Sequence, residues 1–206
     1  MKPVMKLPLL VLNCLLLLSV ACGDSVTELP RLGNDAVILA FGDSLTHGKG
    51  AKENESYPSV LASLSGKKVI NAGVSGEVSS IGLKRLSEAL EEYEPDLLIL
   101  CHGGNDLLRN QSTKKMESNI RKMIQLAKEK NIPVILLGVP KPGIFLSTFE
   151  TYKEIAESTE TVFIENLILD VLSEKTLKSD SVHPNKEGYR FMAESIYSVL
   201  QKSGAL

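Results

Sequence analysis

Short apolar runs alternate along the chain with longer stretches in which apolar residues recur at helical spacing. The runs are rich in β-branched residues and leucine, and they do not alternate apolar with polar positions. Such runs are typical of strands that are buried on both faces of a parallel sheet. Strands are predicted for AVILAF (36–41), KKVINA (67–72), DLLILC (96–101), PVILLGV (133–139) and TVFIEN (161–166).

The stretches between these runs predict helices, since their apolar residues fall on one face. The segment from Ser112 to Lys130 is the clearest, because it opens on a capping serine and is followed by Asn131 and Pro133. Strands that alternate with helices predict a doubly wound α/β domain with right-handed crossovers. Helices are predicted over residues 57–66, 80–92, 112–130, 149–157 and 185–203.

Polar and glycine-rich segments follow the predicted strands. GDSLTHG follows the first strand, GVSGE the second, HGGND the third and VPKPG the fourth, while DSVHPN comes after the fifth strand and its following helix. In an open α/β sheet, ligands bind at the carboxyl ends of the strands, where the strand order reverses. These segments are therefore expected to meet in one functional site.

Residues 1–21 predict a secretion signal. Two lysines precede the apolar segment LPLLVLNCLLLL (7–18), which is too short for a stable membrane span, and the small residues of 19–21 suit an exporting peptidase. Cys22 follows directly, and LSVAC resembles a bacterial lipobox, whose cysteine is lipidated. The alternative is simple export with Cys22 as an incidental residue. We expect an exported protein, either periplasmic or a membrane-anchored lipoprotein.

Length and charge limit the remaining possibilities. The chain has 206 residues, which suits a tether over 22–34, broken by Pro30 and Gly33, and one domain over 35–206. The net charge is −2, and no long cluster of lysine and arginine predicts a nucleic-acid partner. No HExxH motif or Cys/His cluster predicts a metal, and no cofactor is expected.

Ser44, His183 and Asp180 are the candidate catalytic residues. Acyl transfer needs a nucleophile, a base, a group that orients the base, and donors for the oxyanion. Ser44 follows the first strand, His183 is the best candidate base, and Asp180 stands three residues before it, close enough to bind its Nδ1. The alternative interpretation is that these residues only cap helices: Ser44 caps a short helix, and Asp180 or Asn185 caps the last one.

Gly76 and Asn105 are the candidate oxyanion donors beside the N–H of Ser44. Gly76 offers a backbone N–H after the second strand, and Asn105 offers a side-chain amide after two glycines that let the backbone approach closely. Asp43 is expected to hold its turn, and Asp106 to hydrogen-bond its loop. A simple turn is the alternative for GGND.

Ser75, His47 and His102 are rival candidates. Ser75 lacks a strand-to-helix elbow, and the chain has no G-x-S-x-G motif. Neither histidine has a carboxylate at comparable spacing, apart from Asp106 for His102, so both are expected in supporting or rim positions. Cys101 beside His102 suggests a Cys–His dyad, but a cysteine that ends an apolar run is more often a small buried residue.

Taken together, these blocks resemble the GDSL, or SGNH, hydrolase family over about residues 36–200. The family's four signature residues match Ser44 in GDSL, Gly76 in NAGVSGE, Asn105 in GGND and His183 in DSVH, in the family's order. The blocks are most similar to those of small bacterial arylesterases, thioesterases and lysophospholipases. This resemblance implies a three-layer α/β/α sandwich with a flavodoxin-like, parallel five-stranded sheet.

The resemblance also implies a mechanism without a metal. Ser44 is the implied nucleophile, His183 the base and Asp180 its orienter, while the Ser44 N–H, the Gly76 N–H and the Asn105 amide form the implied oxyanion hole. The implied substrates are small acyl esters, thioesters or lysophospholipids.

The substrate pocket is predicted less directly. Ile144, Phe145 and Leu146, together with Phe149, follow VPKPG at the edge of the sheet that would carry the site. They either line an acyl pocket or form the buried face of the next helix. An O-acetylesterase of envelope polysaccharide is the alternative enzyme, and a lipoprotein that uses this domain as a binding scaffold is the non-enzyme alternative.

Overall fold

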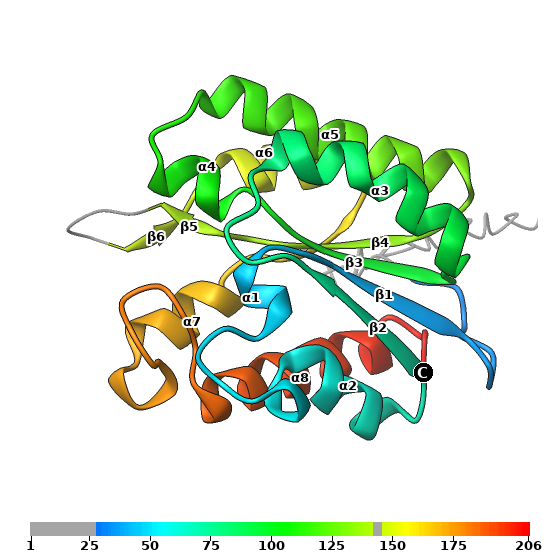
Figure 1. The fold of residues 1–206 in the computed structure, drawn as a ribbon. Helices are drawn as coiled ribbons and strands as arrows, with labels where there is room; N and C mark the ends of the chain where they lie inside the picture. Colours follow the sequence, from blue (N-terminus) through cyan, green and yellow to red (C-terminus); the bar gives the residue numbers. More distant parts are fainter. Residues whose placement is uncertain (1–27, 142–145) are drawn as a thin grey trace, which may run out of the picture.

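A parallel sheet of five strands forms the centre of the computed structural model, which describes residues 28–141 and 146–206. The strand order is β2–β1–β3–β4–β7, which confirms the predicted flavodoxin-like arrangement (Figure 1). The strands are β1 Val37–Gly42, β2 Lys68–Gly73, β3 Leu97–Cys101, β4 Val134–Leu137 and β7 Val162–Ile164.

Burial of the central strands explains why their residues do not alternate in polarity. All residues of β3 and β4 are buried, and so is β1 after its first residue, because helices cover both faces. Gly42 ends β1 beside Cys101 of β3. A Cβ atom on Gly42 would lie 2.2 Å from the carbonyl oxygen of Cys101, so the close approach of these two strand ends requires glycine.

Helices on the two faces of the sheet complete the predicted α/β/α sandwich (Figure 1). One face carries α3 Ser79–Tyr93, α5 Thr113–Glu129 and α6 Thr151–Ser158, and the other carries α2 Tyr57–Ser65, α7 Leu167–Ser173 and α8 Lys186–Lys202. The hydroxyl of Ser112 caps α5 as its sequence indicates. The pattern had implied a helix after the fifth strand without bounds, and α7 is that helix.

Several short elements surround the carboxyl ends of the strands. The hydrophobic pattern did not predict them, because they are too short to show a period. They are α1 Ser44–His47, η1 Glu53–Glu55, α4 Gly104–Leu108, β5 Pro140–Lys141, β6 Ser147–Thr148 and η2 Lys175–Leu177. Strands β5 and β6 form a small antiparallel pair of their own.

The start of the described chain packs on the end of α8. Leu29 and Leu32 are buried, and their N–H groups donate to the carbonyl oxygens of Ser203 (3.0 Å) and Ala205 (2.9 Å). Residues 28–34 of the expected tether therefore extend the domain. The predicted signal and Cys22 lie outside the described residues. Among the helices of 28–141 and 146–206, none combines the length and the hydropathy that a bilayer-spanning helix needs.

Candidate active site

The candidate site lies between the carboxyl ends of β1 and β3, where the strand order reverses. After β1 the chain turns at Asp43, and Ser44 is the first residue of α1. After β3, Gly103 adopts a φ of 103°, a conformation that favours glycine, and the chain enters α4 with Asn105 in its first turn. Because the strands are parallel neighbours, both loops lie at the same edge of the sheet.

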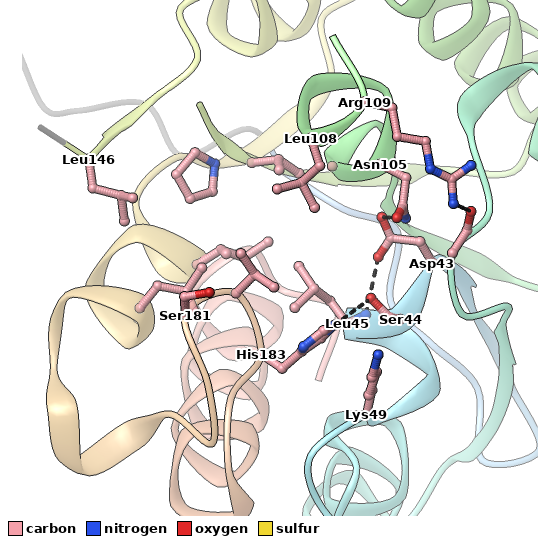
Figure 2. A pocket seen from close by; sticks show the side chains of 17 residues that line it. Asp43, Ser44, Leu45, Lys49, Asn105, Leu108, Arg109, Leu146, Ser181 and His183 are labelled. Carbon is pink, nitrogen blue, oxygen red and sulfur yellow. Dashed lines mark hydrogen bonds between the residues drawn. The ribbon is translucent and has the colours of Figure 1, made fainter. Parts of the chain in front are cut away.

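Ser44, His183 and Asp180 form a chain of hydrogen bonds. The Nε2 atom of His183 lies 3.1 Å from Ser44 Oγ, although 139 positions separate the two residues (Figure 2). The Nδ1 atom lies 2.8 Å from Asp180 Oδ2. With Nδ1–H donating to the carboxylate, Nε2 is left to accept the hydroxyl proton. The structure thus brings together the three residues that the sequence selected.

The loop before α8 holds this histidine. Asp180 Oδ1 accepts hydrogen bonds from the backbone N–H groups of Val182 and His183, each at 2.9 Å. Burial opposes the charge on Asp180, but these bonds and the imidazole hold the pKa of its carboxyl below the usual range. Asn185 caps α8 by accepting from the N–H of Gly188 at 3.0 Å. Asp180 is therefore not the helix cap and remains available to the histidine.

Asp43, and not Ser44, caps α1. Its Oδ1 accepts from the N–H of Leu45 at 3.1 Å, and its Oδ2 accepts from the Asn105 amide at 3.1 Å. Burial raises the pKa of Asp43, although neighbouring His102 and these hydrogen bonds partly oppose the shift. Asp43 holds the turn, as expected, and the Ser44 hydroxyl faces His183.

The two further candidate donors line the same cavity as Ser44. Gly76 stands in a turn closed by a 3.1 Å hydrogen bond from the N–H of Glu77 to the carbonyl of Val74, and its φ of 80° favours glycine. The Asn105 amide also donates to the carbonyl oxygen of Glu77 at 3.1 Å. The structure therefore places Ser44, Gly76 and Asn105 around one space.

His102 is fully buried and uses both ring nitrogens inside the protein. Its Nδ1 accepts from the N–H of Gly103 at 3.0 Å, and its Nε2 lies 3.1 Å from Glu77 Oε2. Since Nδ1 accepts, the proton is assigned to Nε2, which donates to the carboxylate. This histidine has no free nitrogen with which to take a proton from a nucleophile.

The other rival candidates, His47, Ser75 and Cys101, do not line the cavity beside Ser44. His47 and Ser75 are exposed. Cys101 is fully buried, and burial raises the pKa of its thiol well above the usual value, so the reactive thiolate of a Cys–His dyad is disfavoured. Asp106 accepts from the N–H and hydroxyl of Ser79 at 2.8 and 2.7 Å, so it holds the start of α3 and not its own loop.

Glu77 is a buried charged residue that the sequence reasoning missed. Its side chain is 4% exposed, and its two carboxylate oxygens accept from Arg85 Nε at 3.0 Å and Nη2 at 2.8 Å. Burial opposes ionisation, but the hydrogen bonds from His102 and Arg85 lower the pKa of Glu77 to about 2. The spacing of these three residues matches no familiar motif, so only the fold shows that they meet.

This lowered pKa predicts an acid-sensitive component of stability. Ionised Glu77 stabilises the fold fully above its ordinary pKa of 4.5, and the contribution disappears as the pH falls through about 2. At 1.36 kcal/mol per pKa unit, the contribution is up to about 3 kcal/mol. In urea titrations followed by circular dichroism, the free energy of unfolding of the parent should fall more steeply between pH 4.5 and 2 than that of Glu77→Gln. Parallel curves for the two proteins would contradict this assignment.

A cavity of about 550 Å³ opens beside Ser44 and His183. Leu146 is 37% exposed and lines this cavity, which agrees with the prediction that the segment lines an acyl pocket. Ile144 and Phe145, of the same segment, lie outside the described residues. Phe149 is partly buried and packs against the core. Most of the wall is apolar: Leu45, Leu108, Val139, Pro140, Leu146, Ile168, Leu172 and Val182. Ile168 and Leu172 come from α7, whose apolar pairs LI and VL at helical spacing were the available signal.

Comparison with known proteins agrees with this geometry. The profile of the GDSL-like lipase/acylhydrolase family matches residues 40–191. The chain belongs to this family. It is 28% identical to an arylesterase of Vibrio mimicus over 80% of this chain and 88% of the relative. It is 27% identical to thioesterase 1/protease 1/lysophospholipase L1 of Escherichia coli K12, over 80% and 83%.

A solved structure extends the likeness to three dimensions. The psychrotrophic esterase EstA from Pseudoalteromonas sp. superposes with a TM-score of 0.73 and 28% identity, covering 82% of this chain and 98% of that one. As a member of the GDSL family with esterase relatives, the protein is an ester-hydrolysing enzyme. In the part of the GDSL domain that the structure describes, no three His, Cys, Asp or Glu side chains are grouped to hold a metal ion.

Proposed function

We propose that the protein is a serine esterase that hydrolyses carboxylic esters or thioesters through an acyl-enzyme on Ser44. The observation that carries this proposal is the 3.1 Å contact between His183 Nε2 and Ser44 Oγ, with Asp180 on the opposite side of the imidazole. A hydroxyl, a base and a carboxylate in this order are the parts that an activated serine requires.

The proposed cycle has two halves. Ser44 Oγ attacks the carbonyl carbon while His183 takes the hydroxyl proton, and the oxyanion receives hydrogen bonds from the N–H groups of Ser44 and Gly76 and from the Asn105 amide. The two N–H groups of this amide bind Asp43 and the carbonyl oxygen of Glu77 in the free protein, so the one on Asp43 turns to the oxyanion while the other stays on Glu77. His183 then gives the proton to the departing alcohol or thiol, which leaves the acyl group on Ser44. Water activated by His183 attacks this ester, releases the acid and restores Ser44.

The lining of the cavity favours a substrate with an acyl chain of short to medium length and a polar leaving group. Leu146 lies at the end of the cavity away from Ser44, and Leu108 lies between it and Asn105 (Figure 2). Arg109 lies beside Asn105, where its Nη2 also donates to the carbonyl oxygen of Gly76 at 2.9 Å, and Lys49 lies beside Ser44. An apolar wall gains free energy by excluding water from an acyl chain. The two cations suit a leaving group that carries phosphate, so lysophospholipids and phosphate-bearing thioesters belong to the proposed range.

The test is hydrolysis of p-nitrophenyl acetate, butyrate and octanoate, followed by acetylated xylan and lysophosphatidylcholine. Activity that rises from acetate to the longer chains, with one acyl adduct on the Ser44 peptide by mass spectrometry, supports the proposal. Activity limited to acetate and acetylated xylan would replace it by the O-acetylesterase alternative. A folded protein inactive on every substrate would leave the binding-scaffold alternative.

Asn105→Ala is expected to lower kcat about 10²–10³-fold, because one donor to the oxyanion is lost. KM is expected to change little, since this contact strengthens only as negative charge develops. Steady-state kinetics on p-nitrophenyl butyrate checks the effect. Because the amide also binds the buried Asp43, circular dichroism must show that the variant is folded at the assay temperature. Unchanged kcat in a folded variant would remove Asn105 from the oxyanion hole.

Leu146→Ala is expected to lower kcat/KM for the octanoate ester roughly fivefold, which corresponds to about 1 kcal/mol of lost apolar contact. The acetate ester is too short to reach this side chain, so its kcat/KM should stay the same. Leu64→Ala is the matched control, since Leu64 is also 37% exposed but lies in α2 and does not line the cavity. An equal loss on acetate and octanoate would show that Leu146 does not contact the acyl chain.

Export and lipidation remain proposals that rest on the sequence. We propose that residues 1–21 direct the protein out of the cytoplasm and that Cys22 carries a lipid that tethers it to the membrane. Incorporation of labelled palmitate into the full chain, lost in Cys22→Ser, tests the tether. Export without label would leave a free periplasmic enzyme.

A further inference from the structure

Glu77 links two of the groups that surround the proposed oxyanion. Its N–H closes the turn that presents Gly76, and its carbonyl oxygen accepts from the Asn105 amide at 3.1 Å. The same amide donates to Asp43 at 3.1 Å. The position of the Glu77 backbone therefore affects both the Gly76 N–H and the direction of the Asn105 amide.

Two other hydrogen bonds hold the outer side of this turn: the N–H of Val74 donates to the carbonyl oxygen of Gly42 at 3.0 Å, and Arg109 Nη2 donates to the carbonyl oxygen of Gly76 at 2.9 Å. Ser75 is exposed and Val74 is 42% exposed, so the outer half of the turn faces solvent. The Glu77 side chain points the other way and is 4% exposed. A buried carboxylate is stable only when it is paired and hydrogen-bonded, so its partners decide where this end of the turn can lie.

Arg85 of α3 provides the first anchor. Its two hydrogen bonds, at 3.0 and 2.8 Å, reach both carboxylate oxygens of Glu77 and fix the direction of the side chain. Arg85 is itself held by a 3.0 Å bond to the carbonyl oxygen of Ala72 in β2 and by its position 4.0 Å above the ring of Phe41 in β1. The arginine thus ties Glu77 to two strands of the sheet.

His102, just after β3, provides the second anchor. Its Nε2 lies 3.1 Å from Glu77 Oε2, and the N–H of Gly103 binds Nδ1 and so fixes the tautomer. Gly82 of α3 makes room for the ring, since a Cβ atom there would lie 2.3 Å from His102 Nε2. The imidazole joins Glu77 to the same loop that carries Asn105.

We infer that Glu77, which is held by hydrogen bonds to Arg85 and His102, is a positioning residue for the oxyanion hole. It fixes the Gly76 N–H and the Asn105 amide relative to Ser44. This inference rests on the proposed function, because it presumes that those donors receive the oxyanion. A preorganised donor stabilises the transition state without moving at the moment of reaction. A displacement of about 1 Å costs as much as 10²-fold in rate.

Glu77→Gln tests this inference. An amide in place of the carboxylate loses the charge, and it turns an NH₂ group toward a donor of Arg85 or His102, so the turn is expected to shift. We expect kcat on p-nitrophenyl butyrate to fall about 10- to 100-fold, with KM within about twofold of the parent. Glu117→Gln is the matched control, since Glu117 accepts from Arg121 at 2.9 Å on α5, and its kcat should be unchanged.

A pair of substitutions at His102 separates positioning from folding. His102→Leu removes the donor to Glu77 but keeps a side chain of similar bulk, and His102→Gln keeps an N–H donor. Both should lower Tm, whereas kcat should fall about tenfold in the leucine variant and recover in the glutamine variant. This pair also decides the matter if Glu77→Gln does not fold. Ile124→Val, a buried change on α5, shows what a loss of stability alone does to kcat.

The results separate this inference from the proposed function. An active parent with an unchanged kcat in folded Glu77→Gln overturns the positioning role and leaves the esterase intact. Equal kcat in His102→Leu and His102→Gln overturns the part assigned to the His102 hydrogen bond. A parent that is inactive on all esters overturns the proposed function, and the positioning role with it.

Discussion

Ser44→Ala is expected to abolish ester hydrolysis, with kcat on p-nitrophenyl butyrate about 10⁴–10⁶-fold lower than that of the parent. Without the hydroxyl, no acyl-enzyme can form, and His183 can act only on water held in the cavity. The fold should be unaffected, because Asp43 and not Ser44 accepts the capping hydrogen bond of α1. Steady-state kinetics with a Tm measurement checks both statements.

The chain offers a matched control for this experiment. Ser75 is exposed and does not line the cavity, so Ser75→Ala should keep the full kcat of the parent. An organophosphate p-nitrophenyl ester should add one phosphoryl group to the parent and to Ser75→Ala, and none to Ser44→Ala. Full activity in Ser44→Ala would overturn the assignment of the nucleophile, and a loss confined to Ser75→Ala would transfer that role.

His183→Ala is expected to cause the second large loss, about 10⁴–10⁶-fold in kcat. The hydroxyl of an isolated serine is a weak nucleophile, and Nε2 of His183, 3.1 Å away, is the nitrogen placed to take its proton. The contacts that bind the ester before reaction are unchanged, so KM should move little. Kinetics on the butyrate ester measures this split between kcat and KM.

His47→Ala is the control for the histidine. His47 stands at the end of α1, only three residues from Ser44 in sequence, but its side chain is exposed and does not line the cavity. Its removal should leave kcat within about twofold of the parent, as is usual for surface positions. If His47→Ala lost activity and His183→Ala kept it, the base would have been assigned to the wrong residue.

Family membership and the strand pattern were readable without a structure for separate physical reasons. Buried parallel strands need apolar residues at every position, so runs such as DLLILC stand out from the helices around them. The blocks around Ser44, Gly76, Asn105 and His183 combine glycines that a turn requires with side chains that acyl transfer requires. Few other constraints produce that combination in that order, so four weak motifs together identified the family.

Other features depend on contacts that no local pattern records. Leu29 and Leu32 were predicted to belong to a tether, because two leucines in a polar segment show no period. In the structure both are buried against the end of α8. Helix α7 had no predicted bounds, although it supplies Ile168 to the cavity. Asp106 was expected to bind its own loop, but Ser79, 27 positions away, is its partner.

The sequence by itself determined the five strands of the main sheet, most of the long helices, the parallel arrangement and the four motif residues, because these follow from periodicity and local chemistry. The spacing also predicted the partner of His183, but only the tertiary structure decided which carboxylate binds His102. Asp180 reaches His183 within one loop, whereas His102 found its carboxylate in Glu77, 25 positions earlier, and not in Asp106, four positions later. Hydrogen bonds act over about 3 Å, and the folded sheet sets which residues come that close, independently of their distance along the chain.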